Sequence, residues 1–154
     1  MKKNNKFFLI FLPLVFFLNF SNSLANENLN FLSLKNDKVN LRLGPSFDYP
    51  IKLTYKKKYL PVIITDKFET WREIKDFENN SGWIHISQLS KKKSAINIKN
   101  NTIIYKNSTI YSKPIAKLQK GRLVLIKKCK LKWCKITTGD YTGWIIKEIL
   151  WGRT

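Results

Sequence analysis

Side chains able to do covalent or metal chemistry are few in this chain. The sequence contains one histidine, His85, and two cysteines, Cys129 and Cys134. Two thiolates without a spare histidine pair cannot complete a four-ligand zinc site. A redox pair would be spaced Cys-x-x-Cys, whereas four residues separate these cysteines. Nothing in the sequence pairs His85 with a nucleophile, and neither a Gly-x-Ser-x-Gly elbow nor a glycine-rich phosphate loop occurs. The residues therefore predict no enzyme, no cofactor and no metal site.

Carboxylates offer the remaining route to chemistry, and they gather around one predicted hairpin. The group consists of Asp66, Glu69, Glu73, Asp76 and Glu78. Because Lys67, Arg72 and Lys75 are interleaved with them, the pattern indicates a solvated, salt-linked face in which each pair contributes little. Glycoside hydrolysis by a pair of these carboxylates is the alternative.

The first 25 residues have the pattern of a secretory signal peptide. A basic start precedes an apolar run over residues 7–20, and Ser23-Leu24-Ala25 places small residues before a cleavage site after Ala25. The run is shorter than the ~20 residues of a membrane-spanning helix. The sequence therefore predicts a signal helix that is removed on export, and a periplasmic or secreted product.

The spacing of the two cysteines suits a disulfide within a hairpin. Residues 130–133 should turn the chain between two antiparallel strands, which brings Cys129 and Cys134 opposite each other. Facing positions lie about 4.5–5.5 Å apart, within reach of a disulfide. Export exposes the pair to an oxidising compartment. We therefore predict a structural disulfide, with two free thiols as the alternative.

The segments that position these residues occur twice in the sequence, 62 residues apart. Residues 71–74 and 82–84 (Trp-Arg-Glu-Ile and Gly-Trp-Ile) recur as residues 133–136 and 143–145 (Trp-Cys-Lys-Ile and Gly-Trp-Ile). Repeated apolar and turn positions of this kind indicate one small unit used twice.

Each copy predicts the same series of short strands, and the repeat spacing aligns Asn40-Leu41 with Thr102-Ile103. Alternating or β-branched apolar runs mark strands at 38–42, 59–65, 71–76 and 82–86, then near 102–105, 122–129, 133–137 and 141–146. Short strands joined by tight turns predict an all-β fold of two tandem small barrels. The predicted domains are 35–90 and 101–154, and the lysine-rich segment 91–100 is the predicted linker.

The first copy resembles the bacterial Src-homology-3-like (SH3b) domain over about 50 residues. The motifs that carry the resemblance are Asn-Leu-Arg-x-Gly-Pro-Ser at 40–46, Pro-Val at 61–62, Trp-Arg-x-Ile at 71–74, and Gly-Trp-Ile-His-x-Ser-x-Leu at 82–89. In the second copy Lys106-Asn107-Ser108 replaces the Gly-Pro turn, while Cys-x4-Cys and the closing Leu150-Trp151-Gly152 look like an exported two-copy type. The resemblance implies a non-enzymatic binding module, often associated with the cell wall.

The resemblance also implies candidate ligand-binding residues. Trp71 and Trp133 fall where eukaryotic SH3 domains carry the tryptophan of their binding groove, His85 falls near that groove's proline position, and Tyr49 lies on the bordering loop. The alternation of side chains along a strand is consistent with this. Ile74 should face the core, so Trp71, three positions earlier, should point to the opposite face. The alternative is that both tryptophans pack against their own loops or against the other domain.

We therefore expect an exported, non-enzymatic binding or scaffolding module that recognises a cell-envelope component, either peptidoglycan or a segment of an envelope protein. No small-molecule substrate is expected. A cell-wall hydrolase, or an accessory to one, is a third interpretation. The sequence leaves open the ligand's identity, the joint action of the two domains and the oligomeric state.

A polyanion binder is the alternative from another class. The net charge is +19, and residues 101–154 hold 12 basic residues against 2 acidic ones. Such a field attracts nucleic acid, anionic lipid or anionic glycan, through Lys127, Lys128, Lys130 and Lys132 in particular. The lysine-rich usage also fits the codon bias of an AT-rich genome, so the charge itself does not decide between them.

Overall fold

The computed structural model describes residues 30–154, so the predicted signal peptide 1–25 lies outside the described residues. The first of two antiparallel sheets contains β1 (Phe31–Leu34), β2 (Val39–Arg42), β3 (Ile51–Tyr55), β4 (Pro61–Phe68), β5 (Trp71–Lys75), β6 (Ser81–His85) and β7 (Leu89–Ser90). A 3-10 turn, η1 (Ile86–Gln88), precedes β7.

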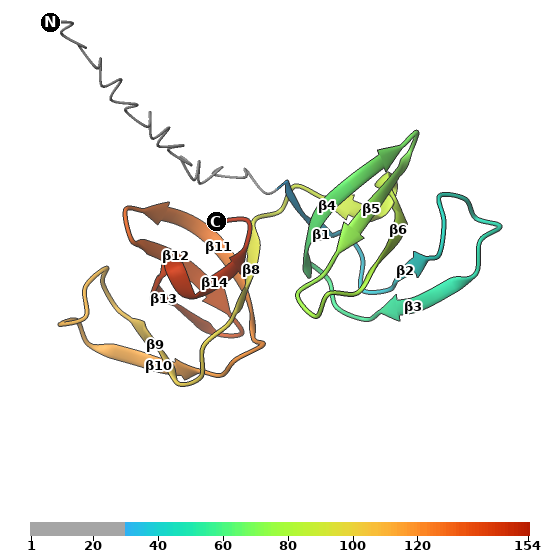
Figure 1. Cartoon of the computed structure of the whole chain (residues 1–154). Coiled ribbons are helices and arrows are strands. Elements are labelled where there is room, and N and C mark those ends of the chain that lie inside the picture. The colour runs from blue at the N-terminus through green and yellow to red at the C-terminus, as the bar shows by residue number, and fades with distance from the viewer. Residues whose placement is uncertain (1–29) are drawn as a thin grey trace, which may run out of the picture.

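The second sheet repeats this series toward the C-terminus (Figure 1). It contains β8 (Ser94–Asn97), β9 (Thr102–Tyr105), β10 (Pro114–Leu118), β11 (Leu123–Lys130), β12 (Trp133–Thr138), β13 (Tyr141–Ile146) and β14 (Leu150–Gly152), with η2 (Lys147–Ile149) before β14. The strand orders are β3-β2-β6-β5-β4-β1-β7 and β10-β9-β13-β12-β11-β8-β14, which are the same topology. The all-β class with two tandem units is confirmed.

Each sheet closes around its own apolar core. Leu41, Val62, Ile74 and Ile84 are fully buried in the first domain, and Ile104, Val124, Ile136 and Ile145 occupy the same places in the second. These residues come from strands in which one face alternates with the other, as a half-buried strand requires. Even the β-bulges repeat, between Ile64 and Asp66 and between Ile126 and Lys128.

One part of the predicted alignment is wrong by a single residue. Leu41 corresponds to Ile104, not to Ile103, because both are buried and their neighbours Arg42 and Tyr105 pair with Trp83 and Trp144. The connection before β4 has five residues (56–60), whereas the one before β11 has four (119–122). A shift of one residue exchanges the two faces of a strand, which is why Ile103 is exposed.

The segment predicted as a linker, 91–100, contains strand β8. All four β8 residues are buried, and the strand pairs with β11 and with β14. Strand β1 has the same role in the first domain, between β4 and β7, although residues 26–34 have little pattern in the sequence. Neither strand has a regular alternation of apolar and polar residues, so periodicity does not reveal them, and the second domain starts earlier than predicted.

The two domains contact each other through aromatic side chains. Trp151 of β14 lies edge-on to Phe31 and Phe77 of the first domain, with ring centroids 5.0 and 5.6 Å away. Hydrogen bonds to the short connection add to this contact, since Ser33 Oγ donates to the Lys92 carbonyl and Arg153 Nη1 donates to the Lys91 carbonyl. The connecting residues are thus held from both sides.

Candidate functional site

Three aromatic rings meet on the outer side of the first domain. Trp71 and His85 are paired residues of β5 and β6, and their ring centroids lie 5.4 Å apart. Phe47, on the loop between β2 and β3, places its ring 4.9 Å from Trp71 and 5.6 Å from His85. Trp71 is only 6% exposed, while Phe47 is 67% exposed. The predicted outward indole is therefore covered by its own loop, and Phe47 is the ring that faces solvent.

A pocket of about 230 Å³ opens beside this ring cluster. Its lining consists of Lys38, Asn40, Arg42, Phe47, Trp71, His85 and Gln88. Two of the four residues predicted from the sequence, Trp71 and His85, lie in it together. Arg42 and Phe47 were not predicted as site residues. Strand periodicity indicates which face of the sheet a residue is on, but it does not show which loop side chain will cover that face.

Arg42 fixes the loop that carries Phe47. Its Nη1 donates to the carbonyl oxygens of Phe47 and Tyr49, at 3.0 and 2.7 Å, and its guanidinium lies 5.6 Å from the Phe47 ring centroid. The Tyr49 ring packs against Gly44, where an added Cβ would come within 2.6 Å of it. Tyr49 therefore shapes the loop and stands outside the lining of the pocket.

His85 does have a hydroxyl partner, which corrects the expectation that nothing pairs with it. Its Nδ1 lies 2.7 Å from Ser87 Oγ and also accepts the Ser87 amide, at 3.4 Å. His85 is the N-cap residue of η1, so this arrangement satisfies the free amide at the start of the turn. The pair is thereby explained as a cap.

The second domain has a pocket of about 200 Å³ at the equivalent place. Tyr105, Ile146 and Ile149 stand there in the positions of Arg42, His85 and Gln88. Trp133 contacts Tyr105 edge-on at 5.7 Å but does not line the pocket. At these three positions the hollow is thus lined by polar side chains in the first domain and by aromatic or aliphatic ones in the second. The polar residues Lys99, Asn100, Asn101 and Thr102 also line the second pocket.

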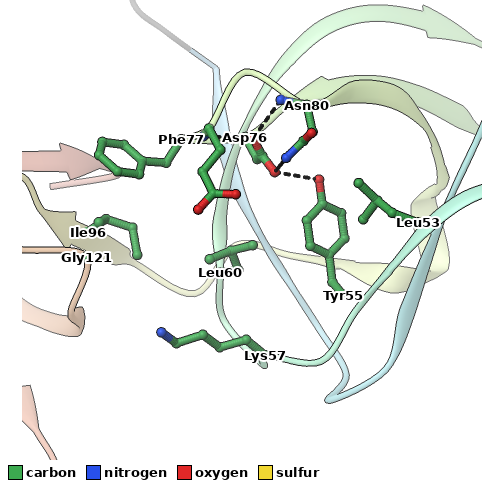
Figure 2. A pocket seen from close by; sticks show the side chains of 10 residues that line it. Leu53, Tyr55, Lys57, Leu60, Asp76, Phe77, Asn80, Ile96 and Gly121 are labelled. Carbon is green, nitrogen blue, oxygen red and sulfur yellow. Dashed lines mark hydrogen bonds between the residues drawn. The ribbon is translucent and has the colours of Figure 1, made fainter.

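A larger pocket, about 350 Å³, lies where the domains meet. Figure 2 shows Phe77 of the first domain above Ile96 and Gly121 of the second domain, on the left of the view. To the right of them in the view, Asp76 accepts the Tyr55 hydroxyl at 2.9 Å and the Asn80 side-chain amide at 2.9 Å (Figure 2). The backbone amides of Glu78 and Asn80 also donate to Asp76.

Asp76 therefore does not belong to the solvated, salt-linked face predicted for the carboxylate group. Its side chain is 6% exposed, and it organises the turn between β5 and β6, in which Asn79 has a left-handed φ of 67°. A buried carboxylate is stable only when its oxygens accept hydrogen bonds, and here backbone amides of the turn supply them.

Tyr55 gives this network a measurable pH dependence. Burial, and then the hydrogen bond and charge of Asp76, raise the pKa of the Tyr55 hydroxyl well above its usual value. The unfolded chain then loses the phenolic proton first, so this contribution to stability is intact below pH ~10 and declines as the pH rises further. Tyr55→Phe should lower the free energy of unfolding by about 2 kcal/mol at pH 8. Above pH ~10 that difference should shrink by about 1.4 kcal/mol per pH unit. Urea unfolding of both proteins at pH 8 and pH 11 measures it, and an unchanged difference would contradict the assignment.

The predicted disulfide is present. Cys129 and Cys134 face each other across β11 and β12 with Cα atoms 4.0 Å apart, and their sulfurs are bonded. Within residues 30–154, no group of three or more metal-ligating side chains comes together. None of the helical turns in that range has the length and apolar character to cross a membrane.

The comparison with protein families places the chain among known binding modules. The model of the family described as "Bacterial SH3 domain" matches it twice, over residues 35–91 and 99–152. The chain belongs to this bacterial SH3 domain family and carries two copies of the domain, which are binding modules. This confirms the resemblance read from the sequence motifs.

Solved structures similar to this chain include NlpC2 and NlpC1 from Trichomonas vaginalis. Their sequence identities are 14% and 13%, with TM-scores of 0.36 and 0.37 over 79% and 82% of this chain. The chain spans about half of those two chains, 47% and 46% of their lengths. No curated protein matches it.

Proposed function

We propose that this protein is an exported, non-enzymatic binding module that holds a cell-envelope ligand in the Phe47–Trp71–His85 pocket. The observation that carries the proposal is the recurrence of a pocket at the same place in both domains, bordered by the ends of β2 and β6 in one and of β9 and β13 in the other. Domains of this family generally bind cell-wall components. We propose a location in the periplasm or outside the cell, which is supported by the signal-peptide pattern of residues 1–25.

The lining favours the peptide part of peptidoglycan over its glycan. Phe47 offers an exposed ring for apolar contact, and Lys38 at the rim offers an exposed ammonium for a carboxylate. Asn40 and Gln88 can exchange hydrogen bonds with peptide amides. The Arg42 guanidinium already donates to two loop carbonyls, so its part is to hold the loop in place. A short peptide that bears a free carboxylate matches these groups.

Co-sedimentation with purified peptidoglycan sacculi tests the proposal. Phe47→Ala should weaken retention about two- to tenfold, since an aromatic contact of this kind is worth about 0.5–1.5 kcal/mol. Phe68→Ala is the matched control, because Phe68 is a similarly exposed phenylalanine of the same domain that does not line the pocket. Equal retention of the two variants would remove the pocket from the mechanism.

Two further readouts of the same experiment address the other interpretations. A polyanion binder would lose retention steeply as salt rises, whereas a peptide held mainly by apolar contact and amide hydrogen bonds would change little. A wall hydrolase would release soluble fragments from the sacculi. We expect retention that weakens only modestly as salt rises, because the contact of Lys38 with the ligand carboxylate is one exposed ion pair, and we expect no release of fragments.

A further inference from the structure

The tip of the β11–β12 hairpin exposes a leucine. Leu131 and Lys132 connect the two strands, and Leu131 is 89% exposed. Its φ of 53° lies in the left-handed region, where glycine or asparagine is the usual residue and a bulky side chain is disfavoured. The turn thus carries an apolar side chain that neither packs in the fold nor suits the local backbone.

Four lysines lie on the same hairpin as this leucine, and the ammonium of one of them, Lys128, lies 5.8 Å from the Trp144 ring centroid. The exposed side chains of Lys127, Lys128, Lys130 and Lys132 lie on the same hairpin. Residues 123–138 include no acidic residue, so no carboxylate of the hairpin itself offsets the charge. The tip therefore combines a dense positive charge with one protruding apolar group.

The equivalent hairpin of the first domain shows that the fold does not require this composition. Its turn has the same left-handed conformation at Glu69, with a φ of 46°, and its strands have the same bulge. Where β11 and β12 pair Lys128 with Lys135, β4 and β5 pair Asp66 with Glu73. The same backbone thus carries acidic residues mixed with basic ones, such as the pair Lys67 and Arg72, in one copy, and lysines with a leucine and no acidic residue in the other.

The disulfide makes the basic hairpin rigid close to its tip. Cys129 and Cys134 are bonded one residue pair below Lys130 and Trp133, which flank the turn. A surface that is already ordered loses less conformational entropy when it binds. The tip is accordingly pre-organised for contact with a partner.

From these observations we infer that the β11–β12 tip docks on an anionic lipid surface. Leu131 inserts among the lipid headgroups while the four lysines bind the headgroup phosphates. A dissolved polyanion would satisfy the lysines but would offer Leu131 no apolar phase, whereas an anionic bilayer supplies both. Stable attachment to a membrane surface generally needs two weak signals, and here they are one apolar anchor and a polybasic patch. This docking is independent of the Phe47–Trp71–His85 pocket.

Vesicle sedimentation tests the inference with the purified protein. Wild type should bind vesicles of phosphatidylglycerol and phosphatidylcholine, and should not bind vesicles of phosphatidylcholine alone. The Lys128→Gln/Lys130→Gln double variant should bind the anionic vesicles about 25-fold more weakly, at roughly fivefold per lysine. The control variant Lys106→Gln/Lys113→Gln has the same charge change on exposed lysines of the β9–β10 loop region, and it should bind within about twofold of wild type.

Leu131→Asn separates the membrane from other polyanions. The charge is unchanged, and asparagine tolerates the left-handed turn, so the fold should be kept. We expect binding to anionic vesicles to weaken about five- to tenfold because the apolar anchor is lost. Wild-type affinity in this variant would overturn the inference. A second result would also overturn the inference: wild type does not bind the anionic vesicles, but it is retained on single-stranded DNA or heparin, and this retention depends on Lys128 and Lys130.

Discussion

Replacing Asn97 by leucine should lower the free energy of unfolding by about 2–4 kcal/mol, although the equivalent residue of the first domain is itself a leucine. Asn97 is fully buried, and its Nδ2 donates to the carbonyl oxygens of Lys99 and Gln119, at 2.7 and 2.9 Å. Its Oδ1 accepts the Thr102 hydroxyl at 3.1 Å. A leucine would remove the side-chain donor to the Gln119 carbonyl, and an unsatisfied group of this kind costs about 1–3 kcal/mol. The Lys99 carbonyl and the Thr102 hydroxyl would each lose one partner but keep the hydrogen bond between them.

The first domain shows the apolar version of the same arrangement. Leu34 pairs with Leu89 in the first domain as Asn97 pairs with Leu150 in the second. Val39 likewise pairs with Tyr55 as Thr102 pairs with Leu118. Leu34 and Val39 therefore stand where Asn97 and Thr102 stand in the second domain. Urea unfolding should therefore show that Asn97→Leu is far more damaging than its size suggests. Adding Thr102→Val should not recover the loss, because the Thr102 hydroxyl still donates to the Lys99 carbonyl and its removal would take that donor away as well. An Asn97→Leu protein as stable as wild type would show that the network contributes nothing.

The strands that could be predicted from the sequence are those with enough alternating residues to establish a face. β4 and β11 have eight residues each, and tryptophan and glycine mark the same points of β5, β6 and their counterparts in each copy. β8 could not be found in this way. Its buried residues are Ser94, Ala95, Ile96 and Asn97, a mixture that has no period and ends on an amide whose burial depends on partners about 20 residues away.

The candidate site could be predicted only where strand pairing alone determines it. Trp71 and His85 face each other across β5 and β6, so their meeting follows from register. Phe47 reaches them from a loop, and that loop is held by hydrogen bonds from Arg42 to backbone carbonyls, which no side-chain pattern reveals. Asp76 was misjudged for a related reason, since a carboxylate in a charged stretch looks solvated until the turn amides that it accepts are seen.

Substituting alanine for Gly82, or for its counterpart Gly143, should lower the free energy of unfolding by about 3 kcal/mol, at the upper end of overpacking effects. A Cβ on Gly82 would lie 2.6 Å from the Arg42 carbonyl oxygen, and a Cβ on Gly143 would lie 2.6 Å from the Tyr105 carbonyl oxygen. Both obstacles are backbone atoms of the neighbouring strand, so the strands must separate before the methyl group fits.

Gly139→Ala is the matched control for these two substitutions. Gly139 has a left-handed φ of 52°, yet a Cβ there would have nothing within 4 Å, so only the backbone preference is lost, about 1 kcal/mol. Urea unfolding of the three variants should rank Gly82→Ala and Gly143→Ala together, well below Gly139→Ala in stability. If all three lose the same amount, the close approach of the strands is not what demands glycine. The expected ranking would assign the glycine of both Gly-Trp-Ile motifs to strand packing, which leaves ligand contact to the rings and loops beside it.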